Sequence, residues 1–173
     1  MTTAPNDPTC IDIVRQARLN GASKLMLVSR IRVVLEKICI LDNLEPWFKG
    51  RGDFQFNAWV LFNDDAYRQH TAHIPMRGVK KISAAPGRNE WAINTCVFDG
   101  FVADSDSMTF GIRAVEKNTY DPDNRLAGFH RQFAGPPQTW AGAYAPKDEA
   151  VVSGAKAIKD WMVWYRVESI PIL

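Results

Sequence analysis

The most regular pattern along the chain is an alternation of apolar and polar positions with a period of two. It occurs in residues 53–62, 107–116 and 161–168. Side chains on a β-strand point to opposite faces in turn, so this alternation predicts three strands with one buried face each. The residues predicted to point inward are Phe54, Phe56, Ala58, Val60 and Phe62, then Met108, Phe110, Ile112 and Ala114, and finally Trp161, Val163, Tyr165 and Val167.

Other stretches lack this alternation and predict different elements. Residues 31–41 are apolar at nearly every position and rich in β-branched residues, which predicts a strand covered on both faces. Residues 91–102 also have strand character, residues 63–70 predict a polar turn, and Pro and Gly between 75 and 87 allow only short strands and loops. Short helices are predicted within residues 1–22 and from Pro146 onward. Residues 128–148 predict a long irregular loop that covers the sheet, anchored by Trp140 and Tyr144.

Several strands separated by turns, with few helices, predict a mainly β fold. We expect an antiparallel β-sandwich with one or two short peripheral helices, and a closed barrel stays open as an alternative. At 173 residues the chain predicts a single domain, residues 1–173. Within it, residues 1–22 form an N-terminal helix or arm, and residues 23–173 form the sandwich with the long loop 128–148.

Composition and charge narrow the function classes. The chain has 21 basic and 19 acidic residues, a formal net charge of +2, spread without clusters, so we expect no nucleic-acid partner. No apolar run reaches the roughly 20 residues of a membrane span, and no signal peptide is recognisable, which predicts a soluble, cytoplasmic protein. Cys10 carries no signal, whereas Cys39 and Cys96 are expected to be reduced, buried strand residues.

Oxygen-bearing side chains gather in two loops that adjoin predicted strands. One group is Asp42, Asn43, Glu45 and Asp53, and the other is Glu116, Asn118, Asp121, Asp123 and Asn124. Calcium takes six to eight oxygen ligands, which such loops supply if they meet at one end of a sandwich. The alternative is that these residues only shape solvated turns, because Asp and Asn bond their own backbone.

At these loops the sequence resembles the C2 domain, a calcium- and phospholipid-binding β-sandwich. The resemblance is carried by "DNLEPWFKGRGDFQF" and "TFGIRAVEKNTYDPDNRLAG", within roughly residues 30–130. It implies a C2-like fold, calcium as the metal, and ligands at Asp42 and Asp53 in the first region and at Glu116, Asn118 and Asn124 in the second. Glu at 116, Asn at 118 and 124, and Ala at 127 depart from the family pattern, and Asp121 or Asp123 would compensate for the lost charge.

The resemblance also gives a function to the loop tip. In C2-like domains, aromatic and basic residues at loop tips enter the lipid headgroup region, a role that Trp47, Phe48 and Lys49 would fill; the alternative is that the two aromatics cap the core. We therefore expect a non-catalytic binding module that engages a membrane surface or a protein partner, with no catalytic residues assigned. Two alternatives stay open: a small-molecule-binding enzyme or carrier with an aromatic pocket, and a structural subunit of a larger assembly.

Overall fold

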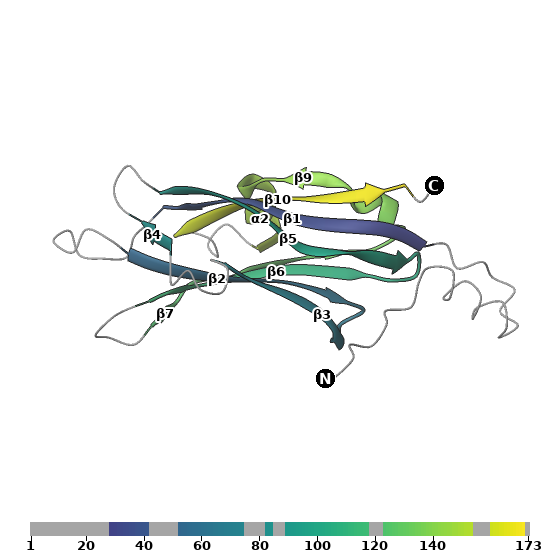
Figure 1. The fold of residues 1–173 in the computed structure, drawn as a ribbon, viewed down its shortest axis with the longest axis horizontal. Helices are drawn as coiled ribbons and strands as arrows, with labels where there is room; N and C mark the ends of the chain where they lie inside the picture. Colours follow the sequence, from purple (N-terminus) through teal and green to yellow (C-terminus); the bar gives the residue numbers. More distant parts are fainter. Residues whose placement is uncertain are drawn as a thin grey trace, which may run out of the picture.

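A computed structural model describes residues 28–41, 52–74, 82–84, 89–117, 123–153 and 160–171. These residues form two antiparallel sheets that lie face to face (Figure 1). The small sheet has the strand order β5 (Glu90–Ala103), β1 (Val28–Ile40), β10 (Trp161–Ile170) and β9 (Gly142–Tyr144). The predicted antiparallel β-sandwich is confirmed, since the described strands form two separate sheets.

The large sheet has the order β3 (Asp65–Ile74), β2 (Gly52–Phe62), β6 (Met108–Glu116) and β7 (Asn124–Arg125). Two further short strands belong to it: β4 (Ile82–Ala84) pairs with β2, and β8 (Phe129–Phe133) pairs with β6. A 3-10 turn, η1 (Pro137–Trp140), and a helix, α2 (Pro146–Ser153), complete the described elements. The helix predicted from Pro146 is confirmed, and the helix or arm predicted for residues 1–22 lies outside the described residues.

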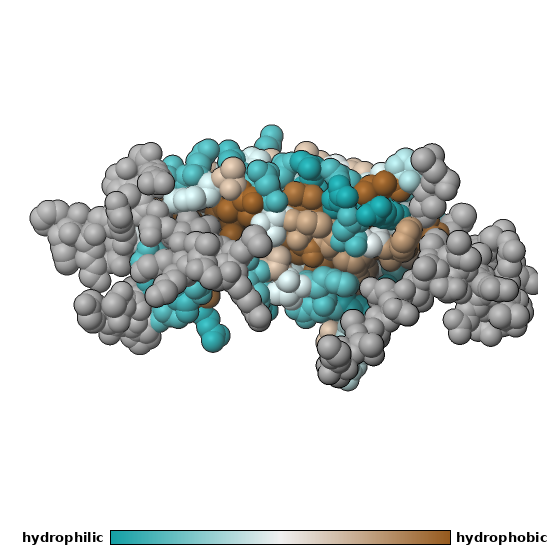
Figure 2. Space-filling model, viewed as in Figure 1, coloured by the Kyte–Doolittle hydropathy of each residue, from teal (hydrophilic) through white to brown (hydrophobic). Residues whose placement is uncertain are grey.

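The core between the sheets consists of the residues that the alternation predicts to point inward. All thirteen of them are buried and belong to one hydrophobic cluster. Aromatic rings from the two sheets meet there: Phe110 of the large sheet lies 4.3 Å from Tyr165 of the small sheet, and Phe56 lies 5.3 Å from Trp161. Figure 2 shows the brown, hydrophobic residues between two more polar layers. Burial of apolar area at about 25 cal/mol per Å² makes this cluster the main source of stability.

Two predictions about strands are wrong. Residues 31–41 are not covered on both faces, because Arg32 and Glu36 of β1 are partly exposed on the outer side of the small sheet. Residues 63–70 are not a polar turn, because only Asn63 and Asp64 turn and the rest belong to β3. Both turn residues have φ of 54°, the conformation of a two-residue hairpin turn, which Asn and Asp tolerate.

The predicted loop 128–148 is also wrong, because this segment contains β8, η1, β9 and the start of α2. Strands of three to five residues are too short to give a readable alternation. The two predicted anchors are confirmed: Trp140 is buried, and its indole nitrogen donates to the carbonyl of Ala134 at 3.2 Å. The Tyr144 hydroxyl donates to the carbonyl of Trp140 at 2.8 Å, and its ring packs against the core.

The two strand cysteines differ in burial. Cys39 is free and buried, as predicted, whereas Cys96 is free but exposed, so that half of the prediction is wrong. The cause is a shift in register between β1 and β5: Val33 pairs with Phe98 and Val34 with Cys96, which leaves Val97 without a partner residue. An extra residue of this kind reverses the alternation, so Val97 turns inward and Cys96 turns outward.

Candidate binding hollow on the large sheet

The outer face of the large sheet carries a hollow of about 760 Å³, called the outer hollow below. Its floor is made mainly by outward-facing positions of β2 and β6, and residues of β3, β7, β8 and the segment between β7 and β8 surround it. The residues that line it are Gln55, Phe56, Asn57, Trp59, His73, Arg113, Ala114, Val115, Arg125, Leu126, Gly128, Phe129 and His130.

Trp59 lies across the floor of the outer hollow because its neighbour on β6 has no side chain. Trp59 pairs with Gly111, and a Cβ placed on Gly111 would lie only 2.1 Å from Cζ2 of the indole ring. Real Cβ atoms do not approach other atoms so closely, so any other residue at 111 would displace the ring. The glycine therefore fixes the position of the tryptophan.

Arg113 is held in place by contacts on two sides. Its guanidinium carbon lies over the Trp59 ring, 5.0 Å from the ring centroid, a cation–π arrangement. On the other side a Cβ on Gly128 would lie 3.1 Å from Cγ of Arg113 and 2.7 Å from the carbonyl oxygen of Ile112, so the chain passes closely here. The guanidinium is thus oriented by its surroundings rather than by an acidic partner.

The charge of the outer hollow has one sign. No Asp or Glu is among its lining residues, whereas Arg113 and Arg125 are. Neither arginine forms an ion pair or a hydrogen bond with a side chain in the described part of the chain. Asn57, next to Arg113 across the strands, has a buried Oδ1 without a hydrogen-bond partner among the described residues. Guanidinium groups without an acidic partner among the described residues are suited to binding an anion, whereas the Asn57 oxygen, as an acceptor, is suited to a hydrogen-bond donor of the same ligand.

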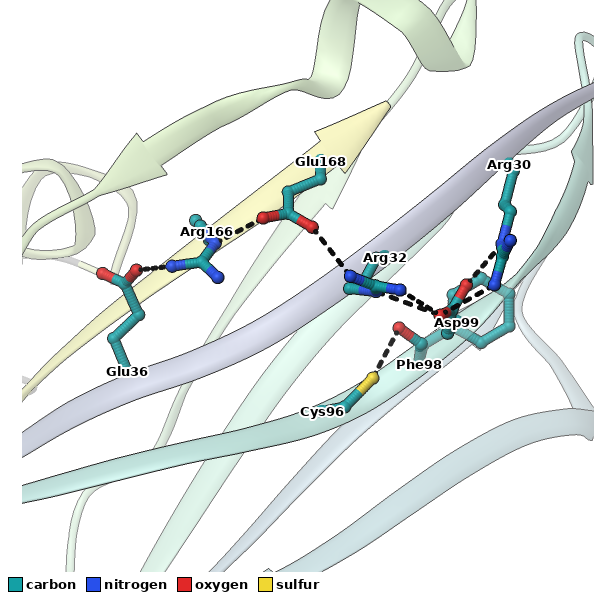
Figure 3. A network of polar contacts seen from close by, with 8 residues as sticks. All are labelled: Arg30, Arg32, Glu36, Cys96, Phe98, Asp99, Arg166 and Glu168. Carbon is teal, nitrogen blue, oxygen red and sulfur yellow. Dashed lines mark hydrogen bonds and ion pairs between the residues drawn. The ribbon is translucent and has the colours of Figure 1, made fainter. Parts of the chain in front are cut away.

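The outer face of the small sheet carries arginines in a different setting (Figure 3). Arg30 and Arg32 both contact Asp99, at 2.8 and 2.9 Å, and Arg32 also lies 3.6 Å from Glu168. We call the whole set the charged ladder: Arg30, Arg32, Glu36, Asp99, Arg166 and Glu168. The hydrogen bond from Arg30, followed by that from Arg32, lowers the pKa of Asp99 below its ordinary value. The charged ladder contains three arginines and three carboxylates, so its positive and negative charges cancel.

The predicted calcium ligands lie in part at one end of the large sheet. Glu116 is adjacent to Phe54 on β2 and pairs with Asn124 on β7, and the Lys117 amide donates to the carbonyl of Asp53 at 2.6 Å. The backbones of the two predicted regions therefore meet.

The described side chains at this end point in different directions. Asp53 belongs to the outward positions of β2, while Glu116 belongs to the buried, inward positions of β6. The carboxylate of Asp123 pairs with the ammonium of Lys117. Within residues 28–41, 52–74, 82–84, 89–117, 123–153 and 160–171, no three His, Cys, Asp or Glu side chains gather as a metal would require.

The other predicted site residues lie outside the described residues. They are Asp42, Asn118 and Asp121 of the calcium set, and Trp47, Phe48 and Lys49 of the loop tip. The calcium set and the loop tip thus stay predictions. A search of the described residues finds no helix long and apolar enough to span a membrane.

Sequence reasoning missed the outer hollow although its signals are in the sequence. The prediction placed Gln55, Asn57 and Trp59 at the polar positions of a strand. It gave a role to Trp59 alone, as one aromatic of the pocket in the enzyme-or-carrier alternative. A tryptophan at an outward position, opposite a glycine in a second alternating strand, is the signal that was available. The pairing of the two strands, which the structure supplies, is needed to bring Trp59, Gly111 and Arg113 together.

The fold and the site define an antiparallel β-sandwich with a basic, aromatic hollow on one outer face. No family model matches the chain, and no curated protein matches it. Among solved structures the chain is similar to a C2 domain of a plant extended synaptotagmin 1, with 5% sequence identity, coverage of 84% of this chain and 96% of that one, and a TM-score of 0.45. That structure belongs to the family that the sequence resembles. At this identity and TM-score the likeness carries no argument about function, and the fold class rests on the two sheets themselves.

Proposed function

We propose that this protein is a non-catalytic binding module that engages an anionic membrane surface through the outer hollow. The observation that carries the proposal is the pair of arginines, Arg113 and Arg125, that line a hollow without an acidic residue. Basic residues near an anionic leaflet contribute about 1 kcal/mol each to binding.

The chemistry of the outer hollow suits a phosphate headgroup. A guanidinium presents two parallel N–H donors that match a phosphate oxygen pair, and it stacks on aromatic rings. Arg113 has this stacking contact with Trp59, so less rotamer entropy is lost when it binds an anion. Tryptophan itself is enriched at membrane interfaces, where its apolar ring and its polar N–H are both accommodated.

The test is vesicle co-sedimentation with phosphatidylcholine alone and with equal parts of phosphatidylcholine and phosphatidylglycerol. We expect binding to the mixed vesicles only, weakened about 30-fold by the double change Arg113→Ala and Arg125→Ala, since two basic residues contribute about 2 kcal/mol. The matched control is Arg30→Ala with Arg166→Ala, which removes the same charge from the charged ladder. Equal binding to neutral vesicles, or an equal loss in the control, contradicts the proposal.

The same assay separates the other candidate functions. Release of the protein from vesicles by a soluble phosphate ester at low concentration would favour the small-molecule carrier. If the protein does not bind vesicles but does bind a protein partner, the protein-binding module is favoured.

Calcium is tested separately, because the described acidic side chains do not form a metal site by themselves. If the calcium prediction holds, millimolar calcium raises the melting temperature of the wild type and not of Asp53→Asn. Calcium has no part in the proposed binding through the outer hollow.

A further inference from the structure

The two faces of strand β8 meet different parts of the molecule. Its exposure alternates from Phe129 to Phe133, so His130 is exposed on the outer side and lines the outer hollow, whereas Arg131 points to the other side. Within the described residues β8 pairs with one strand only, β6, and it also contacts α2. The position of this wall of the outer hollow therefore depends on β6 and on α2.

The contact between α2 and β8 includes a buried ion pair. Glu149 of α2 is completely buried, and its Oε1 lies 3.3 Å from Nε of Arg131. The hydroxyl of Tyr165 on β10 donates to the same oxygen at 2.6 Å. The Arg131 guanidinium lies over the ring of Tyr144, 4.6 Å from its centroid, and Tyr144 stacks on Tyr165 at 5.0 Å. The Glu149 carboxylate thus joins α2, β8 and β10, and Tyr144 of β9 packs against both of its partners.

The polar groups of this junction are only partly satisfied: Nε of Arg131 lies near the Glu149 carboxylate but has no hydrogen-bond partner among the described residues. The other carboxylate oxygen, Oε2, is buried and has no hydrogen-bond partner among the described residues. Burial raises the pKa of Glu149, while the Tyr165 hydrogen bond and the charge of Arg131 oppose that rise. Removing one partner of a buried pair leaves the other charge without compensation, which is far more costly than losing a surface pair.

We propose that Glu149 and Arg131 are positioning residues for the outer hollow, and that α2 acts as a latch that holds β8 and its wall residue His130 in the binding arrangement. This inference rests on the proposed function and adds its regulation: release of α2 loosens β8 and weakens anion binding. Coupling of binding free energies is reciprocal, so occupation of the outer hollow must also tighten α2. Couplings of this kind amount to about fivefold or more in affinity.

The test compares Glu149→Gln with Glu36→Gln in binding to the mixed phosphatidylcholine and phosphatidylglycerol vesicles, well below the melting temperature of each variant. Both changes remove one negative charge, but Glu36 belongs to the charged ladder and does not touch β8. We expect Glu149→Gln to bind about fivefold or more weakly, and Glu36→Gln to bind as the wild type or slightly more tightly. If Glu149→Gln does not fold, Tyr165→Phe removes one contact of the same carboxylate and should weaken binding in the same direction.

Hydrogen exchange supplies a readout that a merely structural role would not change. In the wild type, amides of α2 should exchange more slowly when mixed vesicles are bound, and amides of residues 129–133 should exchange faster in Glu149→Gln. If the wild type binds and Glu149→Gln binds equally, or if vesicles leave α2 exchange unchanged, the latch is excluded and the proposed function stands. If the wild type does not bind mixed vesicles, both are excluded.

Discussion

The outer faces of the two sheets both carry arginines, but they differ in what the arginines contact. On the small sheet Arg30, Arg32 and Arg166 each contact at least one carboxylate of the charged ladder. On the large sheet Arg113 and Arg125 contact none in the described part of the chain. Arginine alone therefore does not distinguish the two faces; the absence of a neutralising carboxylate does.

The two faces differ in whether their guanidinium groups are available to an external anion, rather than in how much they stabilise the fold. Exposed ion pairs contribute about 0–1 kcal/mol each, so the charged ladder adds little to the folding free energy. Its carboxylates do occupy the guanidinium donors that an external anion would need. On the large sheet those donors face solvent, and Trp59 orients one set of them.

The largest expected effect comes from filling the space under Trp59. In Gly111→Ala the new Cβ would lie 2.1 Å from the indole ring, so the ring and Arg113 above it must move. We expect a loss of about 1–3 kcal/mol in unfolding free energy, typical of overpacking, and at least a tenfold loss of binding to mixed vesicles. Urea unfolding and co-sedimentation measure the two effects.

The matched control lies in the small sheet. A Cβ on Gly100 would meet Cζ of Phe98 at 2.9 Å, a milder overlap with another aromatic ring. Gly100→Ala should lower the unfolding free energy and leave vesicle binding unchanged. Binding that survives Gly111→Ala would show that the position of Trp59 does not matter to the outer hollow.

A smaller effect is expected when arginines on the small sheet lose their carboxylate partner and so become like those on the large sheet. Asp99→Asn removes the carboxylate shared by Arg30 and Arg32 and leaves their donors facing solvent. In the variant that already lacks Arg113 and Arg125, we expect Asp99→Asn to raise the affinity for mixed vesicles about fivefold. This factor corresponds to about 1 kcal/mol, the contribution of one additional basic residue. No gain in co-sedimentation would mean that free arginines on a flat face are insufficient, and that the shape of the outer hollow is required.

The sequence predicts the fold where alternation is long. Phe54, Phe110 and Tyr165 lie in strands of nine to eleven residues, and each points inward as predicted. Over such a length the period of two outweighs local exceptions. Shorter strands such as β8 and β9 give no comparable signal, and the bulge that turns Cys96 outward depends on pairing with β1.

The candidate site was harder to predict because it depends on neighbours across strands. Trp59 and Gly111 are 52 positions apart in the sequence, and only their pairing shows that one makes room for the other. Acidic loop residues gave a stronger sequence signal than these outward positions. In the structure, however, Asp53 and Glu116 occupy opposite faces of one sheet, since the side chains of neighbouring strand positions alternate.

The smallest expected effect is the acid dependence of the charged ladder. The pKa of Asp99 is lowered from its ordinary value of 3.8, chiefly by the hydrogen bond from Arg30. A depressed pKa means that the pairs stabilise the fold fully above about pH 4 and that this stabilisation is lost as the pH falls through the folded-state pKa. The difference in unfolding free energy between wild type and Asp99→Asn should therefore be constant, below about 1 kcal/mol, from pH 7 to the ordinary value, and then shrink.

Urea unfolding at a series of pH values measures this difference, and both proteins keep Asp106, whose pKa is also lowered, chiefly by the hydrogen bond from Arg68. The contribution of Asp106 therefore cancels. A difference for Asp99→Asn that disappears well above pH 4 would mean that Arg30 and Arg32 are not held by Asp99 in solution, and the contrast between the two faces would then be lost.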